Sequence, residues 1–192
     1  MPPGRTSGES ARCAIACLVY PQEVEPDLIE VVVEIPRGSR NKYELDKTRG
    51  VVVLDRVLYS SVHYPTDYGF VTGTLALDGD ALDALVVVHE PTFPGCHIMA
   101  RPIGVLDMRD EKGPDQKILA VPIGDPRFDD IRDLNDIGRH WLLEIENFFK
   151  TYKALEPKWT EVVGWEDAGV ALRVIREARH LHDYGIEGSD LP

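Results

Sequence analysis

Three aspartates that could hold a metal ion lie within six residues of one another. Asp78, Asp80 and Asp83 directly precede an apolar run over residues 84–88. Carboxylates at this spacing repel one another, and taking them out of water costs several kcal/mol each unless a cation lies between them. Hard divalent cations such as Mg²⁺ and Ca²⁺ prefer oxygen ligands. The stretch therefore predicts a metal site at the start of a strand, although an Asp-Gly-Asp turn is also common without any metal.

The composition is that of an acidic globular protein. The chain has 192 residues, of which 43% are hydrophobic and 28% charged, with a formal net charge of −12 and a pI of about 4.9. This length fits one domain with a sizeable core. Proteins that bind duplex nucleic acid usually present a basic face, so nucleic acid is not expected as a partner. An acidic protein that handles an anion needs local positive charge from metals or from placed lysines and arginines.

The cysteine pattern and the first residues indicate a cytoplasmic protein. Cys13, Cys17 and Cys96 are odd in number and form no Cys-x-x-Cys pair, so neither a disulfide framework nor a zinc site is expected. No apolar run reaches the length of a transmembrane helix, and the short apolar segment over residues 13–20 lacks the features of a signal peptide. We expect residues 1–24 to form a tail and residues 25–192 to form a single domain.

The first two thirds of the chain carry the pattern of strands. Runs rich in β-branched residues predict strands over residues 28–35, 50–54, 68–74, 84–89, 97–106 and 117–121. The run over residues 84–89 is mostly apolar, which predicts a strand buried on both faces. Residues 107–115 are polar and contain Gly113-Pro114, so they are expected to form a hairpin or a longer loop.

The last third changes to helical periodicity. Apolar residues recur on one face of a helix at Trp141, Ile145, Phe148, Phe149 and Tyr152. A short strand is expected over residues 159–165, followed by a final helix with apolar positions from 168 to 178. Strands first and helices last favour an α+β fold, in which a β-barrel or curled sheet is supported by two C-terminal helices.

Further charged and phenolic residues stand beside these predicted elements. They are Glu34, Lys42-Tyr43-Glu44, Asp55-Arg56, Tyr64-Pro65-Thr66-Asp67-Tyr68-Gly69, Asp110, Asp115, Lys117 and Tyr152-Lys153. Taken singly, each is more simply explained as a solvated surface group, because charged residues are mostly exposed. Taken together, in this order, they have a more specific explanation.

The ordered set, with the aspartate motif, resembles the soluble family I inorganic pyrophosphatases, in particular bacterial, actinobacterial-like members. The resemblance covers about residues 28–165, and the stretch Gly124-Asp125-Pro126-Arg127 fits it as well. It implies an α+β fold with a five-stranded, OB-like β-barrel, the site at one mouth, and two flanking C-terminal α-helices. It also implies a homo-oligomer, which is usually a hexamer in bacterial members.

The resemblance also implies which residues bind metals. Asp78, Asp83 and Asp115 are implied as ligands of a first metal, with Asp83 also reaching a second. Asp110 and Asp115 are implied as ligands of substrate-associated metals. Glu34 is implied as an outer ligand that acts through water.

The resemblance also implies which residue is the general base and which groups bind phosphate. Asp80 is implied as the general base, with Asp115 as the competing assignment because it is central to the metal cluster. The groups implied to bind phosphate oxygens are Lys42, Arg56, Tyr68, Tyr152 and Lys153. Lys117 is implied either to join these groups or to balance the charge of Asp115. Arginine offers a planar fork and lysine a point charge, so both suit a phosphate clamp. Glu44 and Tyr64 are implied to support these groups from behind.

The implied reaction is Mg²⁺-dependent hydrolysis of inorganic diphosphate to two phosphates by in-line attack of a metal-bridged water. The resemblance thus implies a diphosphatase with several Mg²⁺ ions per active site, for which Mn²⁺ or Zn²⁺ could substitute. This mechanism is physically reasonable, because metals neutralise the anion and lower the pKa of water toward about 7. Diphosphate is the expected partner, and neither nucleic acid nor a membrane is expected.

Three other interpretations are weaker. A calcium-binding EF-hand would need a glycine at Asp83 and a glutamate at His89, and both are missing. A nucleic-acid-binding barrel conflicts with the net charge of −12. An inactive relative is the third, because Ala81 replaces the proline usual in the family and leaves the loop more freedom. Every implied metal ligand is nevertheless present.

Overall fold

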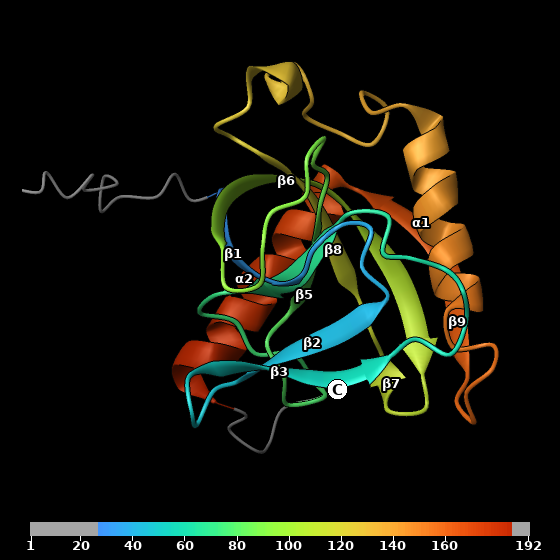
Figure 1. Cartoon of the computed structure of the whole chain (residues 1–192). Coiled ribbons are helices and arrows are strands. Elements are labelled where there is room, and N and C mark those ends of the chain that lie inside the picture. Colours follow the sequence, from blue (N-terminus) through green and yellow to red (C-terminus); the bar gives the residue numbers. More distant parts are fainter. Residues whose placement is uncertain (1–26, 186–192) are drawn as a thin grey trace, which may run out of the picture.

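The structure, a computed structural model, describes residues 27–185 and is built mainly from strands (Figure 1). The strands are β1 (Ile29–Ile35), β2 (Asn41–Asp46), β3 (Val51–Val57), β4 (Asp67–Val71), β5 (Asp83–Val86), β6 (His97–Asp110), β7 (Gly113–Pro114), β8 (Lys117–Pro122) and β9 (Thr160–Asp167). The helices are the 3-10 helix η1 (Pro126–Phe128) and the α-helices α1 (Arg139–Thr151) and α2 (Ala168–Tyr184). Within residues 27–185, no helix is long and apolar enough to cross a membrane.

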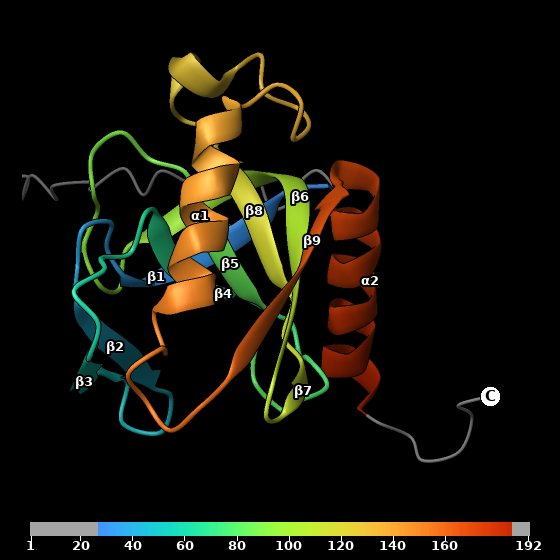
Figure 2. The same cartoon turned by 90° about the vertical axis from the view of Figure 1, so that its right-hand side faces the viewer.

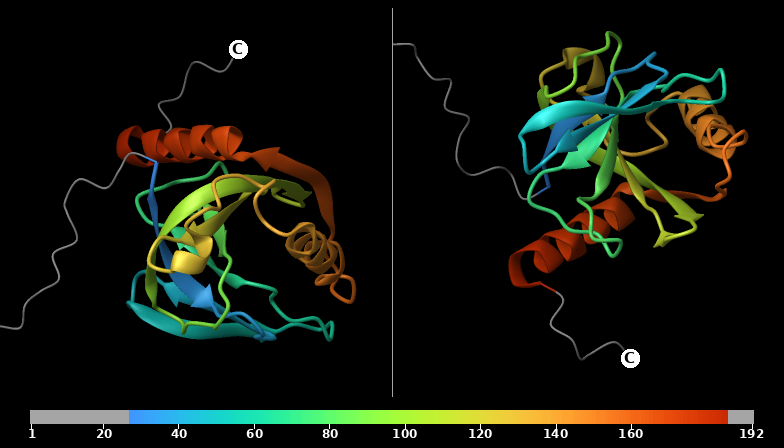
Figure 3. Two further views of the ribbon diagram at one scale, coloured as in Figure 1. Left: turned by 90° about the horizontal axis from the view of Figure 1, so that it is seen from above. Right: turned by 60° about the horizontal axis from the view of Figure 1, so that its bottom comes forward.

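Five of the strands form a closed ring. β1 pairs with β4, β4 with β5, β5 with β8 and β8 with β6, and β6 pairs back with β1. The β5–β8 pair is parallel, whereas the other four pairs are antiparallel. β7 and β9 pair with β6 outside the ring. This arrangement, with its two C-terminal helices, confirms the predicted α+β class and its ring of five strands (Figure 3).

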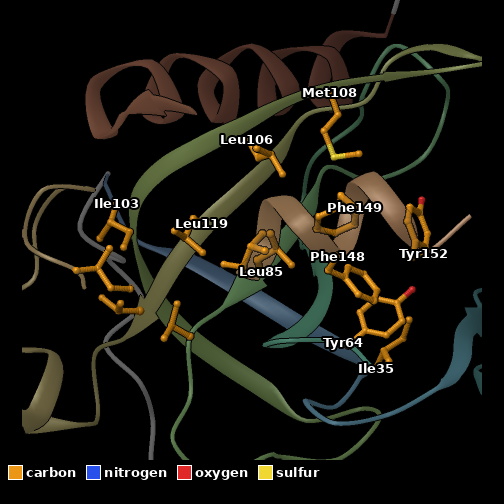
Figure 4. Close-up of a cluster of buried hydrophobic side chains, with 14 of the residues drawn as sticks. Ile35, Tyr64, Leu85, Ile103, Leu106, Met108, Leu119, Phe148, Phe149 and Tyr152 are labelled. Atoms are coloured by element: carbon orange, nitrogen blue, oxygen red, sulfur yellow. The ribbon is translucent and has the colours of Figure 1, made fainter. Parts of the chain in front are cut away.

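β5 and β8 bury both of their faces, because their side chains alternate between two apolar clusters. Leu85 and Leu119 belong to a cluster that includes the apolar face of α1 (Figure 4). Ala84 and Ile118, their neighbours in sequence, belong to a second cluster that α2 helps to form. Residues 84–88 are all buried, so the prediction of a doubly buried strand in this region is confirmed.

The two α-helices cover different sides of the ring (Figure 2). α1 buries Ile145, Phe148 and Phe149, because these residues recur at helical spacing on one face. α2 begins after Asp167, whose side chain accepts a hydrogen bond from the backbone N–H of Val170 at 2.9 Å and so caps the helix. The two predicted helices are confirmed by these elements.

The β2–β3 hairpin forms a separate two-stranded sheet beside the ring. Seen from above, it lies on the opposite side of the ring from α2 (Figure 3, left). Its second strand exposes most of its residues, so burial in a core does little to fix the position of this strand. The ion pairs at its end therefore have a larger part in placing it.

One glycine is required by a close approach inside the ring. Gly69 of β4 lies opposite Val33 of β1. A Cβ atom at this position would lie 1.9 Å from the carbonyl oxygen of Val32. Any side chain at residue 69 would therefore force β1 and β4 apart.

Several predicted boundaries are wrong, because long-range pairing decides where these strands end. β6 ends at Asp110 rather than at residue 106, since β9 pairs with it along residues 104–110. Of the hairpin and the longer loop predicted for residues 107–115, the structure has the hairpin, in which β6 pairs with β7. Only residues 111 and 112 separate β6 from β7. β4 ends at Val71 rather than Thr74, and β5 ends at Val86 rather than His89.

The predicted tail over residues 1–24 lies outside the described residues, as do Cys13 and Cys17. The division of the chain into this tail and a single domain over residues 25–192 stays a prediction.

Candidate active site

A cleft of about 410 Å³ lies where several strand ends and turns meet. Its walls come from the β2–β3 hairpin, the loop before β5, the β6–β7 hairpin and the turn after α1. All the predicted site residues line this cleft except Tyr64. They are Glu34, Lys42, Glu44, Arg56, Tyr68, Asp78, Asp80, Asp83, Asp110, Asp115, Lys117, Tyr152 and Lys153. The fold thus brings together residues far apart in sequence, and their individual roles stay predictions.

The three aspartates of the motif are presented by a loop that its own backbone closes. The N–H of Ala76 donates to the carbonyl of Asp80 at 2.7 Å, and the N–H of Asp80 donates to Asp78 Oδ1 at 3.1 Å. Gly79 permits this turn because its φ is +88°, where residues with a Cβ are rarely found. Asp78 and Asp80 are exposed, whereas Asp83 is half-buried at the start of β5.

Lys117 is buried between two of the predicted metal ligands. Its Nζ donates to Asp83 Oδ2 at 2.7 Å and to Asp115 Oδ1 at 2.9 Å, and its side chain is 3% exposed. Burial by itself lowers the pKa of this ammonium group, but the two carboxylates outweigh burial and leave the pKa raised. Lys117 is therefore charged at neutral pH and holds both carboxylates in place.

Two phenols lie beside this ion pair. The hydroxyl of Tyr68 donates to Asp83 Oδ2 at 2.5 Å, and Lys117 Nζ lies 3.4 Å from the same hydroxyl. Burial, followed by the negative charge of Asp83, raises the pKa of Tyr68, and burial likewise raises the pKa of Tyr152. Both hydroxyls are therefore protonated at neutral pH, and that of Tyr68 could donate to an anion only by giving up its hydrogen bond to Asp83.

The turn after α1 is tied to β6 by a second ion pair. Lys153 Nζ donates to Asp110 Oδ2 at 3.2 Å, and the backbone N–H of Lys112 donates to Asp110 Oδ1 at 2.8 Å. Burial raises the pKa of Asp110, but the Lys112 N–H and the Lys153 ammonium group together lower it by more. Asp110 is therefore ionised at neutral pH.

The β2–β3 hairpin contributes a chain of alternating charges to the cleft. Lys42 pairs with Glu44, and its Nζ lies 3.4 Å from Asp55 Oδ2. Arg56 Nη1 lies 2.6 Å from the same Asp55 oxygen, and its Nε and Nη2 lie 3.1 and 2.9 Å from the two carboxylate oxygens of Glu156. Burial lowers the pKa of Arg56, but these carboxylates outweigh it and leave the pKa raised.

Glu34 and Tyr64 adjoin the cleft from the side of the core. Glu34 Oε1 accepts a hydrogen bond from the backbone N–H of Leu45 at 2.8 Å, which links β1 to β2. Burial is the largest influence on the Glu34 carboxyl and raises its pKa against that hydrogen bond. Tyr64 is buried behind Tyr68, with ring centroids 5.4 Å apart, and packs against Phe148 at 4.6 Å. Tyr64 therefore supports the wall of the cleft and does not line it.

The donor atoms of the cleft suit a hard divalent cation. Of residues 27–185, nine acidic and seven basic side chains line the cleft, together with no cysteine and no histidine. Oxygen donors favour Mg²⁺ over Zn²⁺, which binds nitrogen and sulfur well. Within the same described range, no three side chains converge as a ready metal-binding group. Lys117 lies beside Asp83 and Asp115, and Lys153 lies beside Asp110.

Comparison with known proteins decides the family. A family model described as inorganic pyrophosphatase matches residues 31–183. The chain belongs to the inorganic pyrophosphatase family. An inorganic pyrophosphatase of Halalkalibacterium halodurans is 57% identical over 154 residues, which cover 80% of this chain and 94% of the relative. One from Synechocystis is 53% identical over 157 residues, covering 82% and 93%.

Solved structures agree with this family. The crystal structure of the Thermus thermophilus inorganic pyrophosphatase has a TM-score of 0.82 to this structure at 44% identity, covering 84% of this chain and 94% of that one. The Helicobacter pylori inorganic pyrophosphatase gives a TM-score of 0.81, also at 44% identity, covering 83% and 95%. The family resemblance predicted from the ordered motifs is therefore confirmed.

Sequence reasoning missed two charged residues, one that lines this pyrophosphatase cleft and one behind it. Asp55 was noted only as the neighbour of Arg56, although its carboxylate lies between Lys42 and Arg56. Glu156 was not singled out at all. Its only local signal is its position four residues after Tyr152, one helical turn away, and that spacing does not predict a contact with β3.

Proposed function

We propose that the protein hydrolyses inorganic diphosphate to two phosphates with Mg²⁺ as its metal. The observation that carries the proposal is a cleft in which carboxylates alternate with lysines, an arginine and phenols, in a chain of the inorganic pyrophosphatase family. Such a cleft offers oxygen ligands for cations and hydrogen-bond donors for an anion within one small volume.

The pairing of charges in the cleft explains how a highly charged substrate could bind. Lys117 is paired with Asp83 and Asp115, and Lys153 is paired with Asp110. Diphosphate alone would compete with these carboxylates for the lysines, and a divalent cation alone would compete with the lysines for the carboxylates. When diphosphate and the cation bind together, diphosphate pairs with the lysines and the cation pairs with the carboxylates that the lysines have released. Substrate and metal are therefore expected to bind cooperatively.

We assign the metal-binding role to the carboxylates of the cleft. They are Asp78, Asp83, Asp110 and Asp115, with Glu34 acting through water. When bound, Mg²⁺ would supply positive charge to the substrate and make the attacking water more acidic. This assignment is supported by the oxygen-only donor set, which also makes Mn²⁺ a better substitute than Zn²⁺.

We assign Asp80 as the general base, which accepts the proton of the attacking water. Its carboxylate is 69% exposed, and its ion pair with Lys112 is long, at 3.8 Å. Asp115 Oδ1, in contrast, accepts a hydrogen bond from the buried Lys117. Asp80 can therefore take a proton without breaking a buried ion pair, whereas Asp115, the alternative base, cannot.

We assign to the remaining groups the role of binding phosphate oxygens. They are Lys42, Arg56, Tyr68, Lys117, Tyr152 and Lys153. Ammonium, guanidinium and phenol groups are all hydrogen-bond donors, and raised pKa values keep the protons on Tyr68, Lys117 and Tyr152 at neutral pH. Glu44 is assigned to hold Lys42, and Tyr64 to hold Tyr68.

An inactive relative is the alternative to an active enzyme. It rests on Ala81, which stands where the family usually has proline. The hydrogen bonds from the N–H groups of Ala76 and Asp80 close the loop on the N-terminal side of Ala81. These bonds support an ordered loop without proline, so the active enzyme is the better proposal.

We also propose that the enzyme is cytoplasmic and homo-oligomeric, with a hexamer as the expected assembly. The cytoplasmic assignment is supported by three cysteines without a Cys-x-x-Cys pair. The hexamer is supported by the family resemblance. Light scattering of the purified protein tests it, and a monomeric mass would reject it.

The proposed activity is tested by measuring phosphate release from diphosphate by the purified chain. We expect release with Mg²⁺, loss of release when a chelator is added, and recovery when Mg²⁺ is restored. ATP serves as the control substrate and should release little phosphate. A folded protein that releases no phosphate with Mg²⁺ or Mn²⁺ would support the inactive relative instead.

A further inference from the structure

Arg56 is held by a buried carboxylate that comes from a distant part of the chain. Glu156 Oε1 accepts a hydrogen bond from Arg56 Nε at 3.1 Å, and Glu156 Oε2 forms an ion pair with Arg56 Nη2 at 2.9 Å. Contacts from both carboxylate oxygens to one guanidinium group fix its plane as well as its position. Asp55 Oδ2 accepts a further hydrogen bond, from Nη1 at 2.6 Å.

Burial distinguishes the two carboxylates. The side chain of Glu156 is 4% exposed, whereas that of Asp55 is 32% exposed. Among the described residues, Arg56 is the one side chain that pairs with the Glu156 carboxylate. A buried carboxylate is costly unless it is paired, and a buried ion pair is often no more stable than an apolar one. The pair therefore calls for a reason beyond the stability of the fold.

The pair joins two walls of the cleft. Arg56 lies near the end of β3, in the hairpin that forms its own small sheet, and Glu156 lies in the turn between α1 and β9. Figure 2 shows this turn reaching toward the hairpin. The N–H of Glu156 donates to the carbonyl of Lys153 at 2.8 Å. Glu156 is thereby fixed on the same turn as two proposed phosphate-binding residues, Tyr152 and Lys153.

We infer that Glu156 is a positioning residue that aims Arg56 at the phosphate, an inference that rests on the proposed function. A guanidinium group has five N–H donors, and three of them are engaged by Glu156 and Asp55. Two donors are left to meet phosphate oxygens. A free arginine side chain would have to give up its rotamer freedom on binding, whereas Arg56 has already done so.

The inference is tested with a double-mutant cycle of wild type, Glu156→Gln, Arg56→Ala and the double variant. Calorimetry measures the affinity for methylenediphosphonate, a diphosphate analogue that is not hydrolysed, in the presence of Mg²⁺. We expect Glu156→Gln to weaken binding about tenfold, as is typical when a group that orients a ligand-binding residue is lost. In the Arg56→Ala background the same change should leave the affinity unaltered, because Glu156 acts through Arg56.

Steady-state kinetics on the same four proteins provides the second readout. Glu156→Gln should raise KM for diphosphate about tenfold and change kcat much less, since the contact is made before the transition state. An unchanged affinity in Glu156→Gln would overturn the inference. An equal loss in both backgrounds would overturn it as well, because it would show that Glu156 supports the fold independently of Arg56.

Two controls separate the alternatives. Glu161→Gln changes an exposed glutamate on β9 and should leave both affinity and kinetics unaltered. If Glu156→Gln does not fold, Glu156→Asp keeps the charge but is too short to make both bonds, and the same loss of affinity is expected. Wild type that binds the analogue without releasing phosphate from diphosphate would reject the proposed hydrolysis, whereas the binding cycle would still decide the role of Glu156.

Discussion

Replacing Lys117 by methionine removes one ammonium group and keeps an unbranched side chain of similar length. In the wild type this group lies 2.7 Å from Asp83 Oδ2 and 2.9 Å from Asp115 Oδ1. It also lies over the rings of Tyr68 and Phe149, at 5.5 and 5.4 Å from their centroids, where a methionine packs well. The substitution therefore tests the charge of Lys117 with little change in packing.

The expected loss of stability follows from the burial of the three groups. Removing one partner of a buried ion pair costs about 3–5 kcal/mol. Asp83 and Asp115 keep exposures of 28% and 20%, so water partly solvates them and the lower value of about 3 kcal/mol is expected. For a chain of this size, 1 kcal/mol corresponds to about 2–4 °C in Tm. Lys117→Met should therefore lower Tm by about 6–12 °C when Mg²⁺ is absent.

Thermal unfolding followed by circular dichroism, with and without millimolar Mg²⁺, measures this loss. Mg²⁺ should raise the Tm of Lys117→Met by more than that of the wild type, because a cation between the two aspartates replaces the missing charge. Lys112→Met is the matched control, since the Lys112–Asp80 pair is 3.8 Å long and exposed. It should change the free energy of unfolding by less than about 1 kcal/mol. Equal Tm values for the two variants would refute the reasoning.

Three further substitutions test separate parts of the argument. Asp80→Asn should lower kcat at least about a hundredfold while Mg²⁺ still binds by calorimetry, because the variant cannot accept the proton of the attacking water. Arg56→Lys should raise KM for diphosphate about tenfold, because it keeps the charge and loses the planar fork. Gly69→Ala should destabilise the fold by at least about 3 kcal/mol in urea unfolding, since its Cβ would lie 1.9 Å from the Val32 carbonyl oxygen.

Each of these variants has a matched control. Asp130→Asn and Arg49→Lys make the same chemical changes at exposed positions outside the cleft lining, and their kinetics should stay within about twofold of wild type. Gly124→Ala adds a Cβ with no neighbour within 4 Å and should cost less than about 0.5 kcal/mol. Near-normal turnover of Asp80→Asn would transfer the role of base to Asp115. An unaltered KM in Arg56→Lys would contradict the contact between Arg56 and phosphate. A Gly69→Ala variant as stable as Gly124→Ala would contradict the close approach of Gly69 to the Val32 carbonyl.

Much of the fold could be predicted because its patterns are local. The apolar alternation before residue 122 and the helical spacing of Ile145, Phe148 and Phe149 depend on residues within a few positions of one another. The chemistry could be predicted for a related reason. Carboxylates, lysines and phenols in a particular order define the family, and that order is a property of the sequence alone.

Strand ends and contacts between distant residues could not be predicted in this way. Asp107–Asp110 have the polarity of a loop, yet they belong to β6 because β9 pairs alongside them. Glu34 has the spacing of a surface residue, yet the N–H of Leu45 on the neighbouring hairpin holds it beside the cleft. Where a strand ends and which distant residues make contact depend on which strands pair, and the pairing is decided when the ring closes.

The residue types of the site can be read from the chain without a structure: its carboxylates, its cations and the hydrogen-bond donors that could meet a phosphate. Which of these groups pair with one another depends on how distant segments pack. Lys117 lies between Asp83 and Asp115 because β5 and β8 run parallel with Asp83 opposite Lys117. Arg56 meets Glu156, 100 residues away, because the turn after α1 packs beside the end of β3. Ion-pair energy depends on distance in space and on burial, and both are set only when distant segments pack together.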